Sequence, residues 1–134
     1  MLNEVSILAT IATHVEFCSG IKGSLFRLTR TPQSTKAHVL FIAPLFEQAN
    51  QTRHHITRSA INGYHQNIET IIFDHYGTGD SAGDLHEVEL VLWQQDIAEQ
   101  ISVIRRRSAK PIYLSLPLSA ILLLTPQMLS DVTG

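Results

Sequence analysis

Residues 70–84 read TIIFDHYGTGDSAGD, and this stretch decides the fold class. Its first four residues are β-favouring and almost wholly apolar, which is typical of a strand buried on both faces. The loop that follows is rich in glycine and carries Asp74, Gly77, Gly79 and Ser81. We expect Asp74 and Ser81 to hold this loop through local side-chain-to-backbone hydrogen bonds. The stretch therefore predicts a buried strand that ends in a tightly turned loop.

The segments around this loop alternate between strand and helix patterns. After the loop, apolar side chains recur at spacings of three and four, which predicts a helix with one buried face formed by Leu90, Trp93, Ile97, Ile101 and Ile104. The remaining predicted elements are a hairpin over 15–17 and 24–29, strands over 38–42 and 111–114, a helix over 50–61 ended by Asn62-Gly63, and a helix that begins near 118. Such alternation indicates an α/β fold: a mainly parallel sheet with flanking helices and an N-terminal hairpin.

Composition restricts the class of protein further. The chain has 134 residues, of which 44% are hydrophobic, and fits one domain over 1–134 at about 150 residues per domain. A net charge of -2 argues against a nucleic-acid partner. Pro117 interrupts the longest apolar run, so no membrane span is expected. Because no Lys or Arg precedes Lys22 and Cys18 is the only thiol, we expect no secretory signal and a cytoplasmic protein.

The motifs for nucleotides and metals are incomplete. A dinucleotide loop needs G-x-G-x-x-G running into a helix, but after Gly77 and Gly79 the third position holds Ala82. The adjacent His54 and His55 do not have the spacing of a helical metal pair, and no H-x-x-x-H pair occurs. The basic triplet at 105–107 fits the solvated end of a helix, where cations complement the dipole. We therefore expect no cofactor and no metal.

The loop also carries a family resemblance. The pattern Asp74-x-x-Gly77-x-Gly79-x-Ser81 resembles the D-x-x-G-x-G-x-S loop after the fourth strand of α/β-hydrolases. Together with the later Trp93-x-x-Asp96 pattern, the chain is most similar to the exosortase A system-associated hydrolases, bacterial proteins encoded near polysaccharide-export and protein-sorting genes. The resemblance covers about residues 15–124 and corresponds to the N-terminal half of that fold. It implies an esterase-like hydrolase that takes a small ester or acyl substrate.

The resemblance also assigns a place to the nucleophile, on a sharp turn after the fifth strand with the form G-x-S-x-G. Aligned on the strand at 111–114, that turn is residues 115–119, and the nucleophile position holds Pro117. Proline has no nucleophilic group, and its ring fixes φ where the turn needs an unusual value. Ser115 and Ser119 flank Pro117, but neither has small residues two positions away on both sides.

The other catalytic parts of that fold are incomplete as well. In the family the acid and then the histidine follow the nucleophile, but the last histidine here is His86. A complete triad in the family's order therefore cannot be assembled from this chain. Backbone N–H groups corresponding to an oxyanion hole fall at about Leu45 or Phe46 and at Leu118. The alternative for the segment around Leu45 is that it only caps the strand and fills the core.

Two hypotheses follow from the sequence. In the first, the chain is a truncated or catalytically incomplete relative of the α/β-hydrolases, a pseudoenzyme. In the second, it is a non-catalytic interaction module whose sheet is completed by a partner chain or by a second copy, because an open sheet leaves apolar edges for association.

Overall fold

The computed structural model describes residues 12–134, and within this range five strands form one sheet. The strands are β1 (Thr13–Ser19), β2 (Ser24–Arg30), β3 (Ala37–Phe41), β4 (Ile68–Phe73) and β5 (Ile112–Ser115), in the order β1-β2-β4-β3-β5. β3 pairs in parallel with both β4 and β5, and β1 and β2 form an antiparallel hairpin that joins β4 antiparallel. The predicted α/β class is therefore confirmed.

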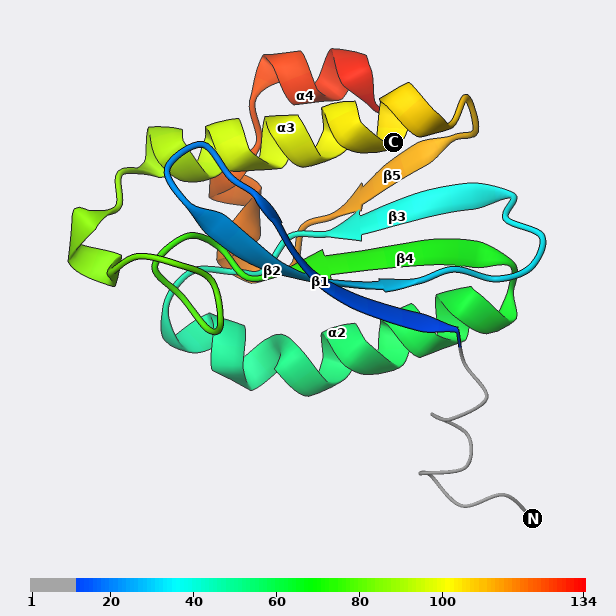
Figure 1. Ribbon diagram of the computed structural model, residues 1–134, viewed down its shortest axis with the longest axis horizontal. Helices are drawn as coiled ribbons and strands as arrows, with labels where there is room; N and C mark the ends of the chain where they lie inside the picture. The colour runs from blue at the N-terminus through cyan, green and yellow to red at the C-terminus, as the bar shows by residue number, and fades with distance from the viewer. Residues whose placement is uncertain (1–11) are drawn as a thin grey trace.

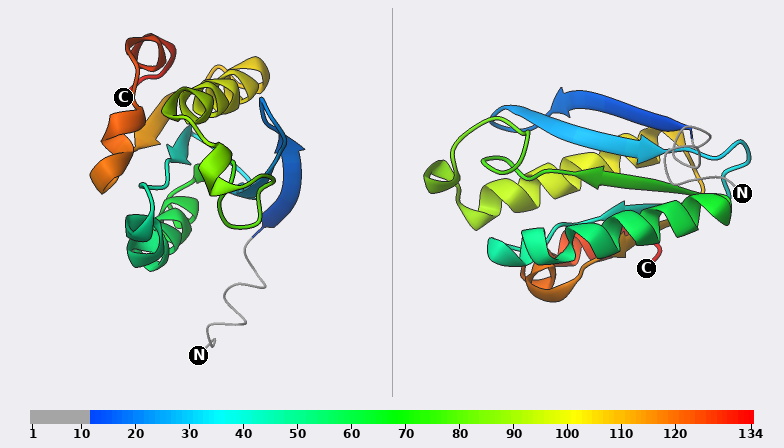
Figure 2. Two further views of the ribbon diagram at one scale, coloured as in Figure 1. Left: turned by 90° about the vertical axis from the view of Figure 1, so that its left-hand side faces the viewer. Right: turned by 90° about the horizontal axis from the view of Figure 1, so that it is seen from below.

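Helices cover both faces of this sheet (Figures 1 and 2). Helix α2 (Glu47–His65) lies on one face, where Ile56 and Ala60 pack around Phe41. Helix α3 (Leu90–Arg107) lies on the other face, and its buried apolar residues belong to the larger core cluster: Trp93, Ile97, Ile101 and Ile104. These are four of the five residues predicted for the buried face. The fifth, Leu90, is 49% exposed because it is the first residue of the helix.

The predicted end of α2 at Asn62-Gly63 is wrong. The helix continues to His65, and Asn67 takes the left-handed φ of 65°. The glycine serves a different purpose here, because a Cβ atom on Gly63 would lie 2.9 Å from Cγ2 of Thr70 in β4. Gly63 therefore allows close contact between helix and sheet rather than ending the helix.

Two short helices follow β5. The segment predicted to begin a helix near 118 is a 3₁₀ helix, η2 (Leu118–Leu123). A further short helix, α4 (Pro126–Asp131), begins at Pro126, and the Thr125 side chain caps it by accepting from the N–H of Met128. Residues 133–134 then lie along β5, where Leu114 N–H donates to Gly134 O at 2.9 Å. The backbone of β5 is thus hydrogen-bonded on both sides.

No helix in the described part of the chain is long and apolar enough to cross a membrane. The first eleven residues, on which the expectation of no secretory signal partly rests, lie outside the described residues. The cytoplasmic location stays a prediction.

Candidate functional site

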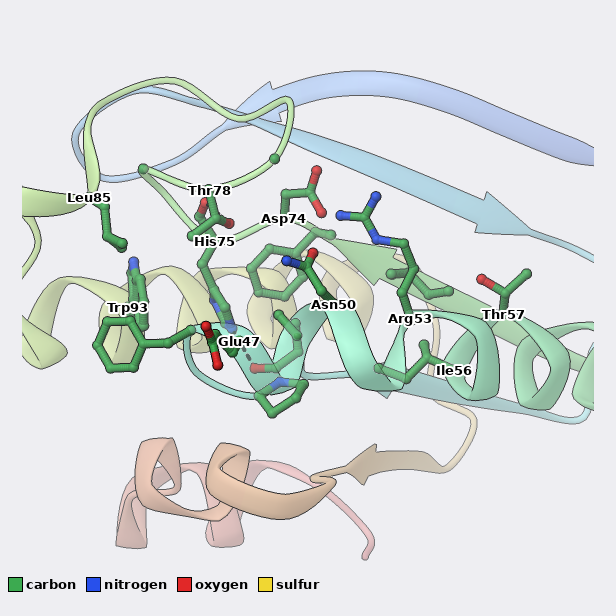
Figure 3. A pocket seen from close by; sticks show the side chains of 18 residues that line it. Glu47, Asn50, Arg53, Ile56, Thr57, Asp74, His75, Thr78, Leu85 and Trp93 are labelled. Atoms are coloured by element: carbon green, nitrogen blue, oxygen red, sulfur yellow. Dashed lines mark hydrogen bonds between the residues drawn. The ribbon is translucent and has the colours of Figure 1, made fainter.

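A cavity of about 430 Å³ opens at the carboxyl ends of β3 and β4, between the first turns of α2 and the glycine-rich loop. Figure 3 shows Asn50 and Arg53 rising from α2 toward Asp74 and His75 of the loop. Trp93, from the start of α3, closes one end. Parallel α/β sheets commonly bind ligands at this edge, so the cavity is the first candidate for a functional site.

The glycine-rich loop is held by the local hydrogen bonds that the sequence indicated. The Asp74 carboxylate accepts from the N–H of Asp80 at 3.0 Å, and the Ser81 hydroxyl donates to the backbone oxygen of Asp74 at 2.6 Å. Ser81 also accepts from the N–H of Phe26, which ties the loop to β2. Gly79 has a φ of 51°, and the Asp74 carboxylate occupies the space that a Cβ there would need. Both the backbone conformation and the close contact therefore require glycine.

His75 is the most buried polar residue of the cavity wall, at 2% exposure. Its ring stacks on Trp93, with centroids 4.8 Å apart, and meets Phe73 edge-on. Its Nε2 lies 2.9 Å from the carbonyl oxygen of Ala43. A carbonyl only accepts, so Nε2 carries the proton and Nδ1 presents a lone pair. Nδ1 is buried and has no hydrogen-bond partner among the described residues.

Burial determines the charge of this ring. Desolvation lowers the pKa of His75 below its ordinary value, and the hydrogen bond to Ala43 and the nearby charge of Asp74 oppose this effect without cancelling it. The imidazole is therefore neutral at pH 7. No acid or nucleophile is hydrogen-bonded to either nitrogen among the residues described, so this histidine is not arranged as a general base for a serine.

The second part of the candidate site is the corner between β5 and η2. The sequence placed the unusual backbone conformation at Pro117, but the structure differs by one residue: Pro117 has a φ of -70°, and Leu118 has the left-handed φ of 52°. The reason is that β5 extends to Ser115, one residue past the predicted end, and the proline ring cannot adopt a positive φ. The Leu118 side chain is 57% exposed. An apolar side chain without nucleophilic chemistry thus occupies the sharpest point of the turn.

One of the backbone N–H groups predicted as oxyanion donors, that of Leu45, is engaged within the chain, and so is the N–H of Ser119, which follows Leu118 at the turn. The N–H of Leu45 donates to the Ser119 hydroxyl at 2.8 Å, and the N–H of Ser119 donates to Oε1 of Gln48 at 3.1 Å. Phe46 has a φ of 55° and an exposed ring that lies 6.4 Å from the ring of Trp93. Two donors that face the corner are therefore already satisfied by side chains of this protein. Gln48 could not be predicted from the sequence, because its partner lies 71 residues away in the chain.

Of the residues predicted for the site, Phe46, Asp74, Gly77 and Gly79 line the cavity together, whereas Ser115, Leu118 and Ser119 do not line it. Ser115 is the last residue of β5, and its backbone oxygen accepts from the N–H of Ile42. Over residues 12–134 no group of three or more His, Cys, Asp or Glu side chains is placed to hold a metal ion.

A scan against protein-family models and a search of curated proteins each found no match for this sequence. Among solved structures, the fold matches an α/β serine hydrolase without lid from Xanthomonas campestris, with 18% identity and a TM-score of 0.64 over 76% of this chain and 49% of that one. A predicted CIB-like hydrolase from Thermoplasma acidophilum matches with 14% identity and a TM-score of 0.63, over 92% of this chain and 60% of the other.

A third similar structure is an α/β serine hydrolase homologue from Coxiella burnetii, with 16% identity and a TM-score of 0.60 over 75% of this chain and 50% of that one. At these identities the likeness establishes the fold, and the chain has the α/β-hydrolase fold. It spans between about half and three-fifths of the length of these three neighbours.

Proposed function

We propose that this protein is a catalytically incomplete α/β-hydrolase-fold protein that binds a small ester or acyl compound without hydrolysing it at the corner after β5. The observation that carries the proposal is the left-handed backbone of Leu118 at the turn between β5 and η2. In this fold the nucleophile sits on such a strand-to-helix turn, and leucine supplies no hydroxyl, thiol or carboxylate. The engagement of the Leu45 and Ser119 N–H groups also supports it.

Ester hydrolysis tests the catalytic half of this proposal. Hydrolysis of 4-nitrophenyl acetate is measured on the unmodified chain and on Ser115→Ala and Ser119→Ala. We expect the three rates to be equal, because neither serine has a histidine placed to activate it. Hydrolysis that is lost in either variant, while the fold is retained by circular dichroism, contradicts the proposal.

The cavity supports the binding half. Its walls are aromatic at the Trp93 end and polar where Asn50 and Arg53 face Asp74 (Figure 3). We expect the guanidinium of Arg53 to favour an acyl compound that carries a carboxylate. Trp93 is the only tryptophan in the chain, so its fluorescence reports binding at this place.

A matched pair of probes tests this specificity. Monoethyl succinate carries a carboxylate and diethyl succinate does not, while both have the same acyl chain. We expect monoethyl succinate to change Trp93 fluorescence at several-fold lower concentration, and Arg53→Met to remove the difference. Equal binding of the two probes to the unmodified chain contradicts the role of Arg53, and no response to either contradicts the binding function.

A relation to the exosortase A system-associated hydrolases is a finer proposal. Its support is the pattern of Asp74, Gly77, Gly79 and Ser81 followed by Trp93-x-x-Asp96. We expect the gene to lie beside genes for polysaccharide export and protein sorting. A chromosomal neighbourhood without such genes contradicts the relation and leaves the fold assignment untouched.

A second candidate function is association with another copy of this chain. The observation that favours it is a group of exposed apolar side chains on η2 and α4, namely Leu118, Ile121, Leu122 and Leu129. Since residues 111–130 contain no charged side chain, this patch is complementary to a second copy of itself. We expect a dimer by light scattering that Leu122→Glu converts to a monomer. A monomer of the unmodified chain at the highest soluble concentration contradicts this candidate.

A further inference from the structure

A buried polar cluster lies at the opposite end of the parallel strands from the cavity. His38 and Glu69 are the second residues of β3 and β4 and stand side by side in the parallel register. Ser108 follows the last residue of α3. The side chains of His38 and Glu69 are each 4% exposed, whereas Ser108 is half-buried and in contact with solvent. The cluster thus combines a buried acid and base with a partly accessible hydroxyl.

These three side chains form a continuous hydrogen-bonded row. Nε2 of His38 lies 2.7 Å from the Ser108 hydroxyl, and Nδ1 of the same ring lies 2.8 Å from Oε1 of Glu69. The Arg107 guanidinium donates to the same carboxylate oxygen at 2.6 Å, and the Thr31 hydroxyl donates to the other at 2.7 Å. Both oxygens of the buried carboxylate are therefore occupied, and the glutamate cannot turn away from the histidine.

The protons in this row can be placed by elimination. Burial alone would raise the pKa of Glu69, but hydrogen bonds from Arg107, Thr31 and His38 together with the charge of Arg107 outweigh it and lower the pKa. The carboxylate is then ionised and only accepts, so Nδ1 of His38 carries a proton. In the neutral ring, Nε2 is consequently the acceptor, and the Ser108 hydroxyl donates to it. The N–H of Lys110 donates to the Ser108 oxygen at 3.2 Å.

We propose that Ser108 is an activated nucleophile, with His38 as its general base and Glu69 as the positioning residue, that reacts with small electrophilic acyl or phosphonyl donors. A serine–histidine–carboxylate set is recognised by its geometry and roles rather than by its place in a fold or its order in the chain. Here the order is His38, Glu69, Ser108, and the place is the amino end of the strands. The inference does not rest on the proposed function, because none of its residues lines the cavity or the corner.

The site restricts the class of donor. Ser108 is half-buried at the surface, so a donor must present its electrophilic atom from solvent. Arg107 and Lys110 lie close to Ser108 in the chain, and Arg107 remains 45% exposed despite its bond to Glu69. Their positive charge favours donors whose reacting group gains negative charge as the new bond forms. Small activated esters and fluorophosphonates meet both requirements.

The reaction with a fluorophosphonate is balanced without a cofactor. The Ser108 oxygen attacks phosphorus, a new oxygen–phosphorus bond forms, and the phosphorus–fluorine bond breaks. Fluoride leaves with the bonding electron pair, and the hydroxyl proton passes to Nε2 of His38. The imidazolium that forms is stabilised by the Glu69 carboxylate on its other nitrogen.

Labelling with a biotin-tagged fluorophosphonate followed by peptide mass mapping tests the proposal. We expect the adduct on Ser108 to form at least about 100-fold faster than on Ser102 or Ser130, which are exposed serines without a histidine partner among the described residues. Ser108→Ala should remove this adduct and leave the slow reaction of Ser130 unchanged. An unmodified Ser108, or a Ser108 that reacts at the rate of Ser130, overturns the proposal.

Variants of the other two residues separate activation from folding. His38→Gln should lower the rate at Ser108 by about 100-fold or more, since general-base catalysis contributes at least that much. If this variant does not fold, the rate of Ser108 in the unmodified chain still decides the outcome. An adduct on Ser115 or Ser119 would instead count against the proposed function, so the two proposals fail in distinguishable ways.

The pH profile tests the positioning role of Glu69. The His38 ring is hydrogen-bonded to Glu69 from β4 and to the Ser108 hydroxyl, and Arg107 from the end of α3 donates to the same Glu69 oxygen. We expect Glu69→Gln to move the midpoint of the labelling rate against pH to lower pH, because the negative charge beside the ring is lost. Glu99→Gln, on an exposed pair with Arg106, should leave the midpoint in place. An unmoved midpoint in a folded Glu69→Gln variant overturns the positioning role.

Discussion

The two ends of the parallel strands each hold a buried histidine, and the two differ in what surrounds the ring. At the carboxyl end, His75 is bonded to a backbone oxygen on Nε2 and stacked on Trp93. At the amino end, His38 stands between a carboxylate on Nδ1 and a hydroxyl on Nε2. The first arrangement fixes a neutral ring in the core, whereas the second is that of a general base.

This difference shows that the groups suited to catalysis do not lie where the fold would place them. The carboxyl end holds the turn after β5 on which this fold places its nucleophile. In this chain that turn presents Leu118, and the N–H groups of Leu45 and Ser119 donate to Ser119 and Gln48. The fold places no catalytic group at the amino end, yet this end holds the serine, histidine and carboxylate of the proposed site. Function therefore has to be argued from the groups at a site rather than from the fold that carries them.

The largest expected effect on the free energy of unfolding comes from replacing Trp93 at the carboxyl end. Trp93 is 2% exposed, stacks on His75, and donates its indole N–H to the backbone oxygen of Tyr76 at 2.8 Å. We expect Trp93→Ala to lower the free energy of unfolding by about 3–5 kcal/mol, which is typical of removing a large buried aromatic side chain. Urea unfolding measures it. Trp93→Phe keeps an aromatic ring and should lower the free energy of unfolding by less. A loss below about 1 kcal/mol for Trp93→Ala contradicts the packing described here.

Removal of the buried acid at the amino end should have the next largest effect. Glu69→Ala leaves the buried His38 without its partner and should cost about 3 kcal/mol of unfolding free energy. The matched control is Glu99→Ala, whose pair with Arg106 is exposed and should be worth less than about 1 kcal/mol. Equal losses in the two variants, measured by urea unfolding, would show that the amino-end cluster is not a buried network.

The pH dependence of stability tests the burial of His75. Burial lowers the pKa of His75 in the folded protein, so below about pH 6.5 the unfolded chain binds a proton at this residue that the folded chain does not. The free energy of unfolding therefore falls as pH decreases below about 6.5, by at most about 1.4 kcal/mol per pH unit from this residue. His75→Phe should reduce the slope in that range. The same slope in both proteins, measured by urea unfolding between pH 7 and pH 5, argues against a buried neutral His75.

The smallest effect on the free energy of unfolding is expected at the corner between β5 and η2. Ser119→Ala removes the acceptor for the N–H of Leu45 and should cost about 1 kcal/mol, the usual range for one hydrogen bond. We expect no change in the fluorophosphonate labelling rate at Ser108, because the two serines lie at opposite ends of the strands. A slower rate at Ser108 in Ser119→Ala would show that the two ends are coupled.

The order of strands and helices could be predicted because the spacing of apolar residues within each short segment indicates which of its side chains are buried. Strand β4 and helix α3 show as a continuous apolar run and as spacings of three and four, ending near the predicted positions. The end of α2 could not be predicted, because Gly63 is needed for the close approach of the helix to Thr70, which belongs to β4. A glycine needed for close approach and one that ends a helix look the same in a sequence.

The sites were predicted less well for a related reason. The corner was predicted one residue early because the end of β5 depends on its pairing with β3, which runs to Ser115 opposite Phe41. The residues of the amino-end cluster are separated by 31 and 70 positions along the chain. The parallel register brings His38 and Glu69 together, and the end of α3 places Ser108 beside them. In the sequence, His38 is simply the first residue of a predicted strand. No local pattern connects it with an acid and a serine.

The position of the ring proton on each buried histidine tests the contrast between the two ends most directly. We predict that ¹⁵N NMR of the imidazole rings at pH 8 shows His38 protonated on Nδ1 with a bare Nε2, and His75 protonated on Nε2 with a bare Nδ1. Variants His38→Gln and His75→Phe assign the two sets of signals. A proton on Nε2 of His38, in either the neutral ring or the imidazolium, would contradict the account, because that ring could not accept the hydroxyl proton of Ser108.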